Sequence, residues 1–421
     1  MTAEVTRLAN GLLVVTETMA HLETTSLGVW VAVGSRHERP KEHGLSHLLE
    51  HMAFKGTTRR TAADIAVEIE AMGGELNAAT GVEATAYYAR VLKGDEGTAF
   101  DIIADILKGS VFEDGELAKE RDVILQEIAG ALDSPDDIAY DLLHDAAYPG
   151  QAAGRPILGT PKSVKAIFAP DLKGFLSKHY SPSRMVIAAV GAVRHDEVLR
   201  HVEALFGGLI ALDGVPEDPA RYVGGVRVNA RRFEQSHLLL GFRSPSYLDP
   251  GFFSAQVLSG LLGGGMSSRL FQEVREKRGL CYSVYSSAWG LKDTGMFAIH
   301  TASGAQQLDE LSDVVIAELE RLAADSPSEA EVARSKAQLK AGLLMSLESS
   351  SARAEQLARQ LLFHGRVLEI AAIRDAVDRV TPDDVRATAA EIFASTPSLA
   401  IVGAGRSAAA IAERARARLA S

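Results

Sequence analysis

The stretch PDLKGFLSKHYSPSRMVIAAVG, residues 170–191, has a counterpart near the end of the chain in PDDVRATAAEIFASTPSLAIVG, residues 382–403. In both stretches Pro-Asp opens a helical pattern, Ser and Pro follow, and a short apolar strand ends in glycine. The offset between them is 212 residues, about half of the chain. Self-similarity at a fixed offset indicates a duplicated domain.

An earlier pair of segments supports the duplication. GVWVAVGSRHE (28–38) and HLLLGFRSPSY (237–247) each read as an apolar strand that runs into a polar turn. The segment 207–225 is rich in Gly, Pro and Asp, which favours a connection between domains. We predict a first domain over residues 1–210, a linker over 211–225 and a homologous second domain over 226–421. Neighbouring strands mix with helices, so each half is expected to be α+β, a mostly antiparallel sheet with helices packed on one side.

Composition excludes several classes of protein. The formal net charge is −11 and no run is rich in Lys or Arg, which argues against nucleic-acid binding. The one cysteine, Cys281, allows no internal disulfide and no thiolate zinc cage. Apolar runs such as MVIAAVGAV are too short to span a bilayer, and the N-terminus lacks the features of a signal or transit peptide.

The segment GLSHLLEHMAFKGT, residues 44–57, reads as a helix with two different faces. Apolar residues at i, i+3, i+4, i+7 and i+8 form one face and predict a core contact: Leu45, Leu48, Leu49, Met52 and Ala53. The opposite face carries His47, Glu50, His51 and Phe54, where a solvated helix would carry lysine and glutamate.

Two histidines at i and i+4 project from successive turns and can reach one metal ion at about 2.0–2.1 Å. Glu50 points beside such an ion, where it can hold a water molecule, take its proton and pass it to a leaving amine. The alternative is a helix whose histidines are ordinary hydrogen-bonded residues, which is the commoner case for any single pair at this spacing. The inverted order His-x-x-Glu-His is a known protease signature, but it needs a third ligand.

A third ligand is available in ELAKERDVILQEIAG, residues 116–130, a predicted helix with Asp114 as its N-cap. Glu120 and Glu127 lie seven residues apart in a stripe shared with apolar residues. Unpaired burial of such carboxylates would cost several kcal/mol, so a cation partner is indicated. The alternative is a tilted stripe with both carboxylates in solvent. A His, His, Glu set with an open position is typical of catalytic zinc proteases, although manganese or cobalt can bind the same set.

Four motifs occur together in one order: HLLEHMAFKGT (47–57), GGELNAATGVEATAYYARVL (73–92), ERDVILQEI (120–128) and SSRLFQEVREKRGLCYSVYS (267–286). With these motifs the chain resembles the pitrilysin-type, inverted-motif zinc metallopeptidases (peptidase family M16), over nearly its whole length. Within them it is similar to the processing-peptidase branch, which includes the catalytic subunit of the mitochondrial processing peptidase and its bacterial relatives.

The resemblance implies a metal site in the first domain. His47, His51 and Glu127 are implied as ligands of one Zn²⁺ per chain, and Glu50 as the general base. Glu120 is implied as a catalytic-site carboxylate that supports the ligands from behind. The second half contains no His-x-x-Glu-His motif, so the resemblance makes it a non-catalytic, substrate-binding domain.

The resemblance also implies substrate contacts: Phe54, Asn77, Ala78, Arg275, Tyr282, Asp137 and Asp141. Asn77 and Ala78 would lie on an edge strand to which an extended peptide adds as a further strand. Phe54 would shape the pocket just after the scissile bond, and Arg275 with Tyr282 would reach across to the substrate.

Asp137 and Asp141 would receive a substrate arginine, as in the processing enzymes. Without the resemblance, all seven residues read as ordinary strand, core, packed or surface positions.

The expected function is a zinc endopeptidase that cleaves extended, basic or presequence-like peptides inside a closed chamber. Two such domains form half of the family's chamber of four, so a homodimer or a heterodimer with a related subunit is expected. The alternatives are a non-catalytic peptide-binding or core-complex subunit of the same fold, and a binding module with a structural metal. The expected location is the bacterial cytoplasm, with a compartment like the mitochondrial matrix as the alternative.

Overall fold

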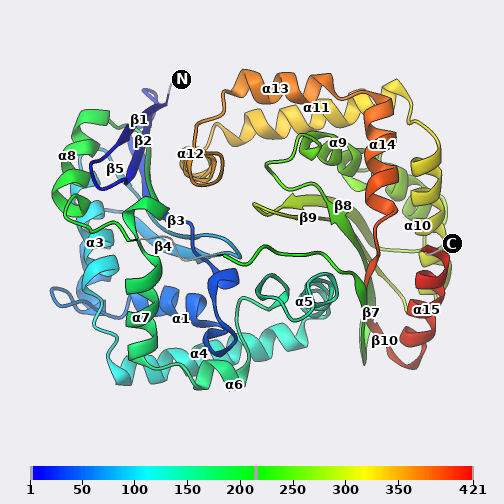
Figure 1. Cartoon of the computed structure of the whole chain (residues 1–421), viewed down its shortest axis with the longest axis horizontal. Coiled ribbons are helices and arrows are strands. Elements are labelled where there is room, and N and C mark those ends of the chain that lie inside the picture. The colour runs from blue at the N-terminus through cyan, green and yellow to red at the C-terminus, as the bar shows by residue number, and fades with distance from the viewer. Residues whose placement is uncertain (1–2, 213–216, 420–421) are drawn as a thin grey trace. The chain divides into compact units, whose positions relative to one another are not determined.

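The computed structural model describes residues 3–212 and 217–419 and divides into two compact units (Figure 1). The first unit comprises Met1–Ile128, Pro156–Asp218 and Met345–Leu368; the second comprises Ala129–Arg155, Pro219–Leu344 and Glu369–Ser421. The units differ from the predicted domains in two segments. Ala129–Arg155, from the first half of the sequence, belongs to the second unit, and Met345–Leu368, from the second half, belongs to the first unit. Residues 213–216 of the predicted linker lie outside the described residues.

The sheet of the first unit has the strand order β1-β2-β6-β3-β5-β4. Its strands are β1 (Glu4–Arg7), β2 (Leu13–Thr18), β3 (Thr24–Val31), β4 (Glu75–Thr80), β5 (Thr85–Leu92) and β6 (Met185–Gly191). β2 and β6 are parallel, and every other neighbouring pair is antiparallel. The mostly antiparallel sheet predicted from the sequence is therefore confirmed.

The sheet of the second unit repeats this pattern with fewer strands. Its order is β10-β7-β9-β8, with β7 (Gly225–Ser244), β8 (Ser283–Gly290), β9 (Gly295–Ser303) and β10 (Ser398–Ala404). β10 pairs in parallel with the start of the long strand β7, Ser398 opposite Gly225, and in the reverse sense with its end, Ser398 opposite Gly241. The two ends of β7 thus take the places of β2 and β3, and β10 takes the place of β6. The predicted duplication is confirmed in the strand order.

The helices of the first unit are α1 (Leu45–Ala53), α2 (Ala62–Ala71), α3 (Glu96–Gly109), α4 (Asp114–Asp133, which continues into the second unit), α6 (Pro161–Lys165), α7 (Ala169–His179), α8 (His195–Phe206) and α12 (Ser350–His364). Those of the second unit are α5 (Pro135–Ala147), α9 (Phe252–Gly263), α10 (Leu308–Ala324), α11 (Glu329–Ser346, which ends in the first unit), α13 (Ile370–Arg379), α14 (Pro382–Phe393) and α15 (Ala408–Leu419). Short helical turns lie at Ser35–His37, Pro40–Glu42, Ala152–Gly154, Pro182–Arg184, Phe271–Glu276 and Gly405–Ser407.

Each sheet packs against the main core of its unit with one face. Its other face packs against a helix that comes from the other half of the sequence, which we call the exchanged helix: α12 in the first unit and α5 in the second. In the first unit Val14, Leu27 and Ile187 face the helices α1, α3 and α8, whereas Trp30 and Val186 on the other face pack against α12. In the second unit α5 packs against the second face of the sheet. The predicted arrangement, with helices on one side, is therefore incomplete, because the covering helix comes from the other half of the sequence.

A buried ion pair fixes α12 to the first sheet. The guanidinium of Arg353 donates to both carboxylate oxygens of Glu17, at 3.1 and 2.7 Å. Both side chains are buried, so removing either would leave an uncompensated charge in the core. Among the described residues, no helix is long and apolar enough to cross a membrane.

Candidate functional site

Helix α1 begins with a tight turn and a buried cap. Gly44 has φ +90°, and an added Cβ would lie 2.9 Å from the carbonyl oxygen of Leu158, so only glycine suits this position. The buried carboxylate of Glu38 accepts hydrogen bonds from the backbone N–H groups of Gly44 (2.9 Å) and Ser46 (2.7 Å). A carboxylate at this end also favours the helix dipole. The predicted apolar face is confirmed, since all five of its residues are buried.

The second face of α1 directs both imidazoles at α4. His47 Nε2 lies 3.8 Å from Glu127 Oε2, and His51 Nε2 lies 3.7 Å from Glu127 Oε1. One ligand atom from each of the three residues lies within 4.8 Å of the other two. Two nitrogens and one carboxylate oxygen are a donor set that suits zinc, so the residues present fit this ion.

The other ring nitrogen of His51, Nδ1, is hydrogen-bonded to a carboxylate on α4. Its Nδ1 lies 3.0 Å from Glu120 Oε2, and Lys55 Nζ lies 2.6 Å from the other oxygen of that carboxylate. Burial opposes ionisation of Glu120, but the hydrogen bonds from Lys55 and His51 outweigh it and lower the pKa of this carboxyl group. An ionised Glu120 can only accept a hydrogen bond, so Nδ1 of His51 carries the proton and donates it, which leaves the lone pair on Nε2 facing Glu127.

His47 is kept neutral at physiological pH. Burial lowers its pKa to about 4, and the neighbouring His51 ring acts in the same direction. The two rings are in edge contact, with centroids 4.6 Å apart. Nδ1 of His47 is buried and has no partner among the described residues. A neutral imidazole is the form that binds a metal.

Glu50 is half-buried on the same face, one residue before His51. Two tyrosine hydroxyls, Tyr87 and Tyr180, hydrogen-bond each other at 3.1 Å close to this carboxylate. Burial raises the pKa of both phenols, Tyr180 to about 12, and the charge of Glu50 contributes to each shift. Both tyrosines therefore stay protonated and uncharged beside Glu50.

The sequence prediction for α4 was right for one carboxylate and wrong for the other. Glu120 is buried, whereas the side chain of Glu127 is 40% exposed. Two helical turns separate them, so Glu120 lies against Lys55 at the end of α1 while Glu127 lies at the open side of the two imidazoles. Asp114 is the first residue of the helix rather than its cap. The carboxylate of Glu113 accepts from the Glu116 N–H at 2.9 Å and takes the capping role.

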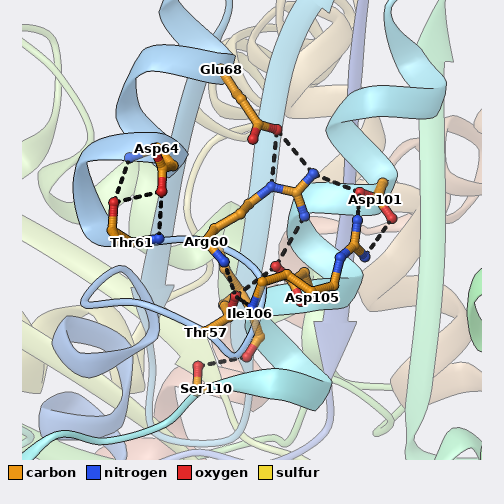
Figure 2. Close-up of polar contacts among 10 residues, drawn as sticks. Thr57, Arg60, Thr61, Asp64, Glu68, Asp101, Asp105, Ile106 and Ser110 are labelled. Atoms are coloured by element: carbon orange, nitrogen blue, oxygen red, sulfur yellow. Dashed lines mark hydrogen bonds and ion pairs between the residues drawn. The ribbon is translucent and has the colours of Figure 1, made fainter.

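The segment after α1 is fixed by a buried arginine (Figure 2). Arg60 donates to Asp105 at 2.9 Å, to Asp101 at 2.7 Å and to Glu68 at 2.9 Å. Thr57 also donates to Asp105, at 2.7 Å. The network ties the chain beyond α1 to α2 and α3, and so holds the end of α1, which carries His51, and the following Lys55.

Strand β4 forms an edge of the first sheet, as the resemblance implies for Asn77 and Ala78. Asn77 is exposed and Ala78 is buried. Oδ1 of Asn77 accepts from the N–H of Ala78 at 2.8 Å, so a side chain rather than a further strand bonds this N–H. An edge of this kind can accept an added strand if the side chain moves aside.

A groove of about 840 Å³ runs along this edge, between the second face of the sheet and α12. Its lining includes Trp30, Asn77, Ala79 and Tyr88 from the sheet and Glu355 from α12. Among the described residues that line it there is no side chain of the His47, His51 and Glu127 cluster. β4 therefore lies between α1 and the groove. Helix α1, which carries the histidines, contacts one face of β4, where Thr80 donates to the Ser46 carbonyl at 3.4 Å. The groove follows the other face of β4.

Phe54 caps the C-terminus of α1. It is half-buried and packs against the core of the first unit. Its position agrees with both interpretations from the sequence, because part of the ring belongs to the core and part remains accessible one turn from Glu50.

Arg275 and Tyr282 lie together in the second unit. The guanidinium of Arg275 lies 5.5 Å from the centroid of the Tyr282 ring and 4.9 Å from that of Phe271. Tyr282 is 73% exposed, so the sequence alternative of a packed tyrosine is wrong.

Asp137 and Asp141 lie one turn apart on α5, also in the second unit. Although Asp141 is exposed as a residue, the protein atoms around its carboxyl group raise its pKa to about 6, and the charge of Asp137 adds to the shift. Two carboxylates at i and i+4 that repel each other are stabilised by a bound cation such as a guanidinium.

Sequence reasoning missed four supporting residues: Glu38, Lys55, Tyr87 and Tyr180. Lys55 follows His51 by four residues, so helical spacing could have placed it on the ligand face. The other three come from a short turn, from β5 and from the segment after α7, and no local pattern connects them to α1.

Comparisons with known proteins match both halves of the chain to one family. The family described as "Insulinase (Peptidase family M16)" matches residues 13–161, and the one described as "Peptidase M16 inactive domain" matches residues 167–339. An uncharacterized zinc protease of Streptomyces coelicolor is 39% identical over 411 residues, covering 94% of this chain and 89% of that protein. An uncharacterized zinc protease of Bacillus subtilis is 36% identical, covering 93% of this chain and 96% of that protein.

The fold has also been seen in a crystal structure. A protease from Helicobacter pylori superimposes with a TM-score of 0.88 at 23% identity, covering 95% of this chain and 99% of that one. At this identity the likeness concerns the fold alone.

Proposed function

Because this chain belongs to peptidase family M16 and is a zinc metallopeptidase, we propose that His47, His51 and Glu127 hold its zinc ion and that Glu50 is its general base. The observation that carries the proposal is the orientation of both Nε2 atoms toward one carboxylate, 3.8 and 3.7 Å away. Glu120 holds the His51 tautomer that this arrangement requires.

Zinc, when bound, supplies a Lewis acid that activates a water molecule and polarises the scissile carbonyl. Glu50 lies on the ligand face of α1, so its carboxylate takes the proton of the attacking water and later gives it to the leaving amine. The protonated tyrosines Tyr87 and Tyr180 keep negative charge away from this carboxylate. Lys55 and Glu120 keep His51 in place throughout.

The substrate is an extended peptide that adds to the edge of β4 beside Asn77 and Ala78. An added strand gains main-chain hydrogen bonds without regard to side chains, which suits a peptidase acting on unfolded segments. Phe54 contacts the residue after the scissile bond. Asp137 and Asp141 receive a substrate arginine, and Arg275 with Tyr282 makes a further contact.

By likeness to the processing-peptidase branch, the chain acts on presequence-like peptides in a closed chamber built by a homodimer or by a pair of related chains. Light scattering of the purified protein tests this part, which is independent of the chemistry. If the protein is a monomer at the concentration of the assay and still has full turnover, the proposed closed chamber is wrong.

The decisive experiment is cleavage of a fluorogenic peptide library by the wild type, by Glu50→Gln and by Glu70→Gln. Glu70 is exposed on α2 and serves as the matched control. Glu50→Gln should keep its zinc and lose about 10²–10⁴-fold in turnover, whereas Glu70→Gln should match the wild type. Chelation should abolish turnover and added zinc should restore it.

A non-catalytic subunit of the same fold gives a different result. Such a protein would bind zinc and peptides while its turnover equals that of Glu50→Gln. All four motif residues are present, and His47, His51 and Glu127 face one another, which favours the enzyme.

A further inference from the structure

The second unit contains a separate cluster of metal-ligand side chains: Asp136, His237 and His300. His300 Nε2 lies 2.8 Å from Asp136 Oδ1 and 3.0 Å from His237 Nδ1, and His237 Nδ1 lies 3.5 Å from Asp136 Oδ1. Both histidines are buried, whereas the side chain of Asp136 is 48% exposed. The zinc peptidase chemistry of the first unit uses none of these residues.

The sheet and one helix bring the three residues together. His237 on β7 pairs with Ala302, and His300 on β9 pairs with Leu239, so the two histidines are diagonal neighbours on one face. That face is covered by α5, which begins with the Ser134 cap and Pro135 and places Asp136 in its first turn. The exchanged helix therefore supplies the anionic member of the cluster.

Protons and a metal ion satisfy the three contacts differently. If His300 Nε2 carries a proton, the carboxylate of Asp136 and the lone pair of His237 Nδ1 share it in a three-centre hydrogen bond, which is weaker at each acceptor than a full one. If His237 Nδ1 instead donates to His300, lone pairs of Nε2 and Oδ1 face each other at 2.8 Å. A cation among the three lone pairs makes every contact attractive.

The spacing of the three atoms suits such a cation. The circle through them has a radius of about 1.8 Å, so an ion about 1 Å out of their plane lies about 2.0–2.1 Å from each, the distance that zinc requires. We propose that Asp136, His237 and His300 bind a second divalent transition metal ion, zinc in the first instance, in the second unit. Two imidazoles and one carboxylate favour zinc, cobalt or nickel over calcium and magnesium, which prefer oxygen ligands.

Two aromatic rings hold His300 in the required orientation. Tyr285 stacks on it with centroids 4.6 Å apart, Tyr140 stacks on it at 5.9 Å, and the two tyrosine hydroxyls hydrogen-bond at 2.9 Å. Nδ1 of His300 has no partner among the described residues, so the ring makes its polar contacts through Nε2. The half-exposed Asp136 leaves a way in for the ion. The ion would link α5 to the sheet and so fasten the exchanged helix.

The test counts metal in the full chain after dialysis against micromolar zinc. The wild type should hold about two zinc ions, and His51→Gln, Asp136→Asn and His237→Gln should each hold about one. The double variant His51→Gln/Asp136→Asn should hold none. Asp137→Asn and His144→Gln are the matched controls, since both lie on α5 outside the cluster, and both should keep two.

A spectroscopic measurement guards against variants that fold poorly. Cobalt bound to His51→Gln should give a d–d absorption band that Asp136→Asn removes and Asp137→Asn leaves in place, while far-UV circular dichroism stays unchanged. A wild type with one zinc ion, lost in His51→Gln and unaffected by Asp136→Asn, would overturn the second site. The proposed function is judged separately, because turnover of Glu50→Gln does not depend on metal in the second unit.

Discussion

Helix α1 of the first unit and helix α9 of the second occupy the same place in the duplicated fold and carry different surfaces. Each follows the central strand of its sheet and packs against a later helix, α4 in one unit and α11 in the other. α1 meets α4 through His47, His51 and two glutamates. α9 meets α11 through small groups: an added Cβ at Gly260 would lie 2.4 Å from Ser335 Oγ, and that hydroxyl donates to the Val257 carbonyl at 2.7 Å.

This difference shows that the fold does not require the polar face of α1. The second unit builds the same sheet with a helix whose buried residues are mainly apolar, among them Val257, Leu258 and Leu261. Buried carboxylates and imidazoles cost free energy unless they are paired. Helix α1 therefore bears a cost that helix α9 avoids, and the proposed zinc site accounts for that cost.

The largest expected effect concerns Glu120 and Glu127, the two carboxylates through which α4 meets α1. Glu127→Gln removes a ligand and should weaken zinc binding by more than about 100-fold, whereas Glu120→Gln removes only the support of His51 and should cost about 10–100-fold. Competition with a chelating dye measures both constants. Equal losses in the two variants would mean that the carboxylates do not play different roles.

A second prediction compares the arginines that fix the segments after α1 and α9. Arg60 bonds to the buried Asp105, and Arg269 bonds to Glu331 on α11 at 2.7 Å. Arg60→Leu leaves the buried carboxylate of Asp105 without its charged partner and should lower the free energy of unfolding by about 3 kcal/mol. Arg269→Leu removes an ion pair that is partly exposed to solvent, and should lower the free energy of unfolding by about 1 kcal/mol. Thermal unfolding of both variants checks the order, and a reversed order would contradict it.

A third prediction tests the close approach of α9 and α11. Gly260→Ala forces a methyl group against Ser335 and should destabilise the protein by about 1–3 kcal/mol. Gly342→Ala, on α11 with no neighbouring atom within 4 Å, should stabilise it by about 0.5–1 kcal/mol. The melting temperatures should therefore shift in opposite directions. A gain in stability from Gly260→Ala would mean that the two helices have room to separate.

The smallest effect is a pH dependence in the second unit. The hydrogen bond from Arg269 is the largest cause that lowers the pKa of Glu331, from an ordinary 4.5 to about 2, against the opposing effect of burial. Below pH 4.5 the unfolded chain takes up a proton that the folded chain does not, so this stabilisation is complete above pH 4.5 and is lost as the pH falls toward 2. The stability difference between the wild type and Arg269→Leu should shrink over that range. A constant difference would show that the charge of Glu331 plays no part.

Local periodicity predicted the parts of the molecule that depend on neighbours in sequence. The buried stripe of α1 and the repeated helix and strand at 170–191 and 382–403 follow from spacing alone. The exchange of α5 and α12 between the units could not be predicted in this way. The sheet against which a helix packs depends on contacts between residues far apart in the sequence.

The two candidate sites differ in the same way. His47 and His51 are four residues apart, so helical geometry brings them together before any tertiary contact is known. Asp136, His237 and His300 come from three separate segments, and each one alone looks like an ordinary strand or helix residue. Only the register of β7 with β9 and the position of α5 make them neighbours.

The most direct test of the account is an anomalous difference map from crystals of the zinc-loaded chain, recorded on both sides of the zinc absorption edge. The account predicts a peak at about 2.0–2.1 Å from Nε2 of His47, Nε2 of His51 and a carboxylate oxygen of Glu127, with Glu50 beside it and no peak between α9 and α11. A fully loaded crystal without a peak at these three residues would contradict it.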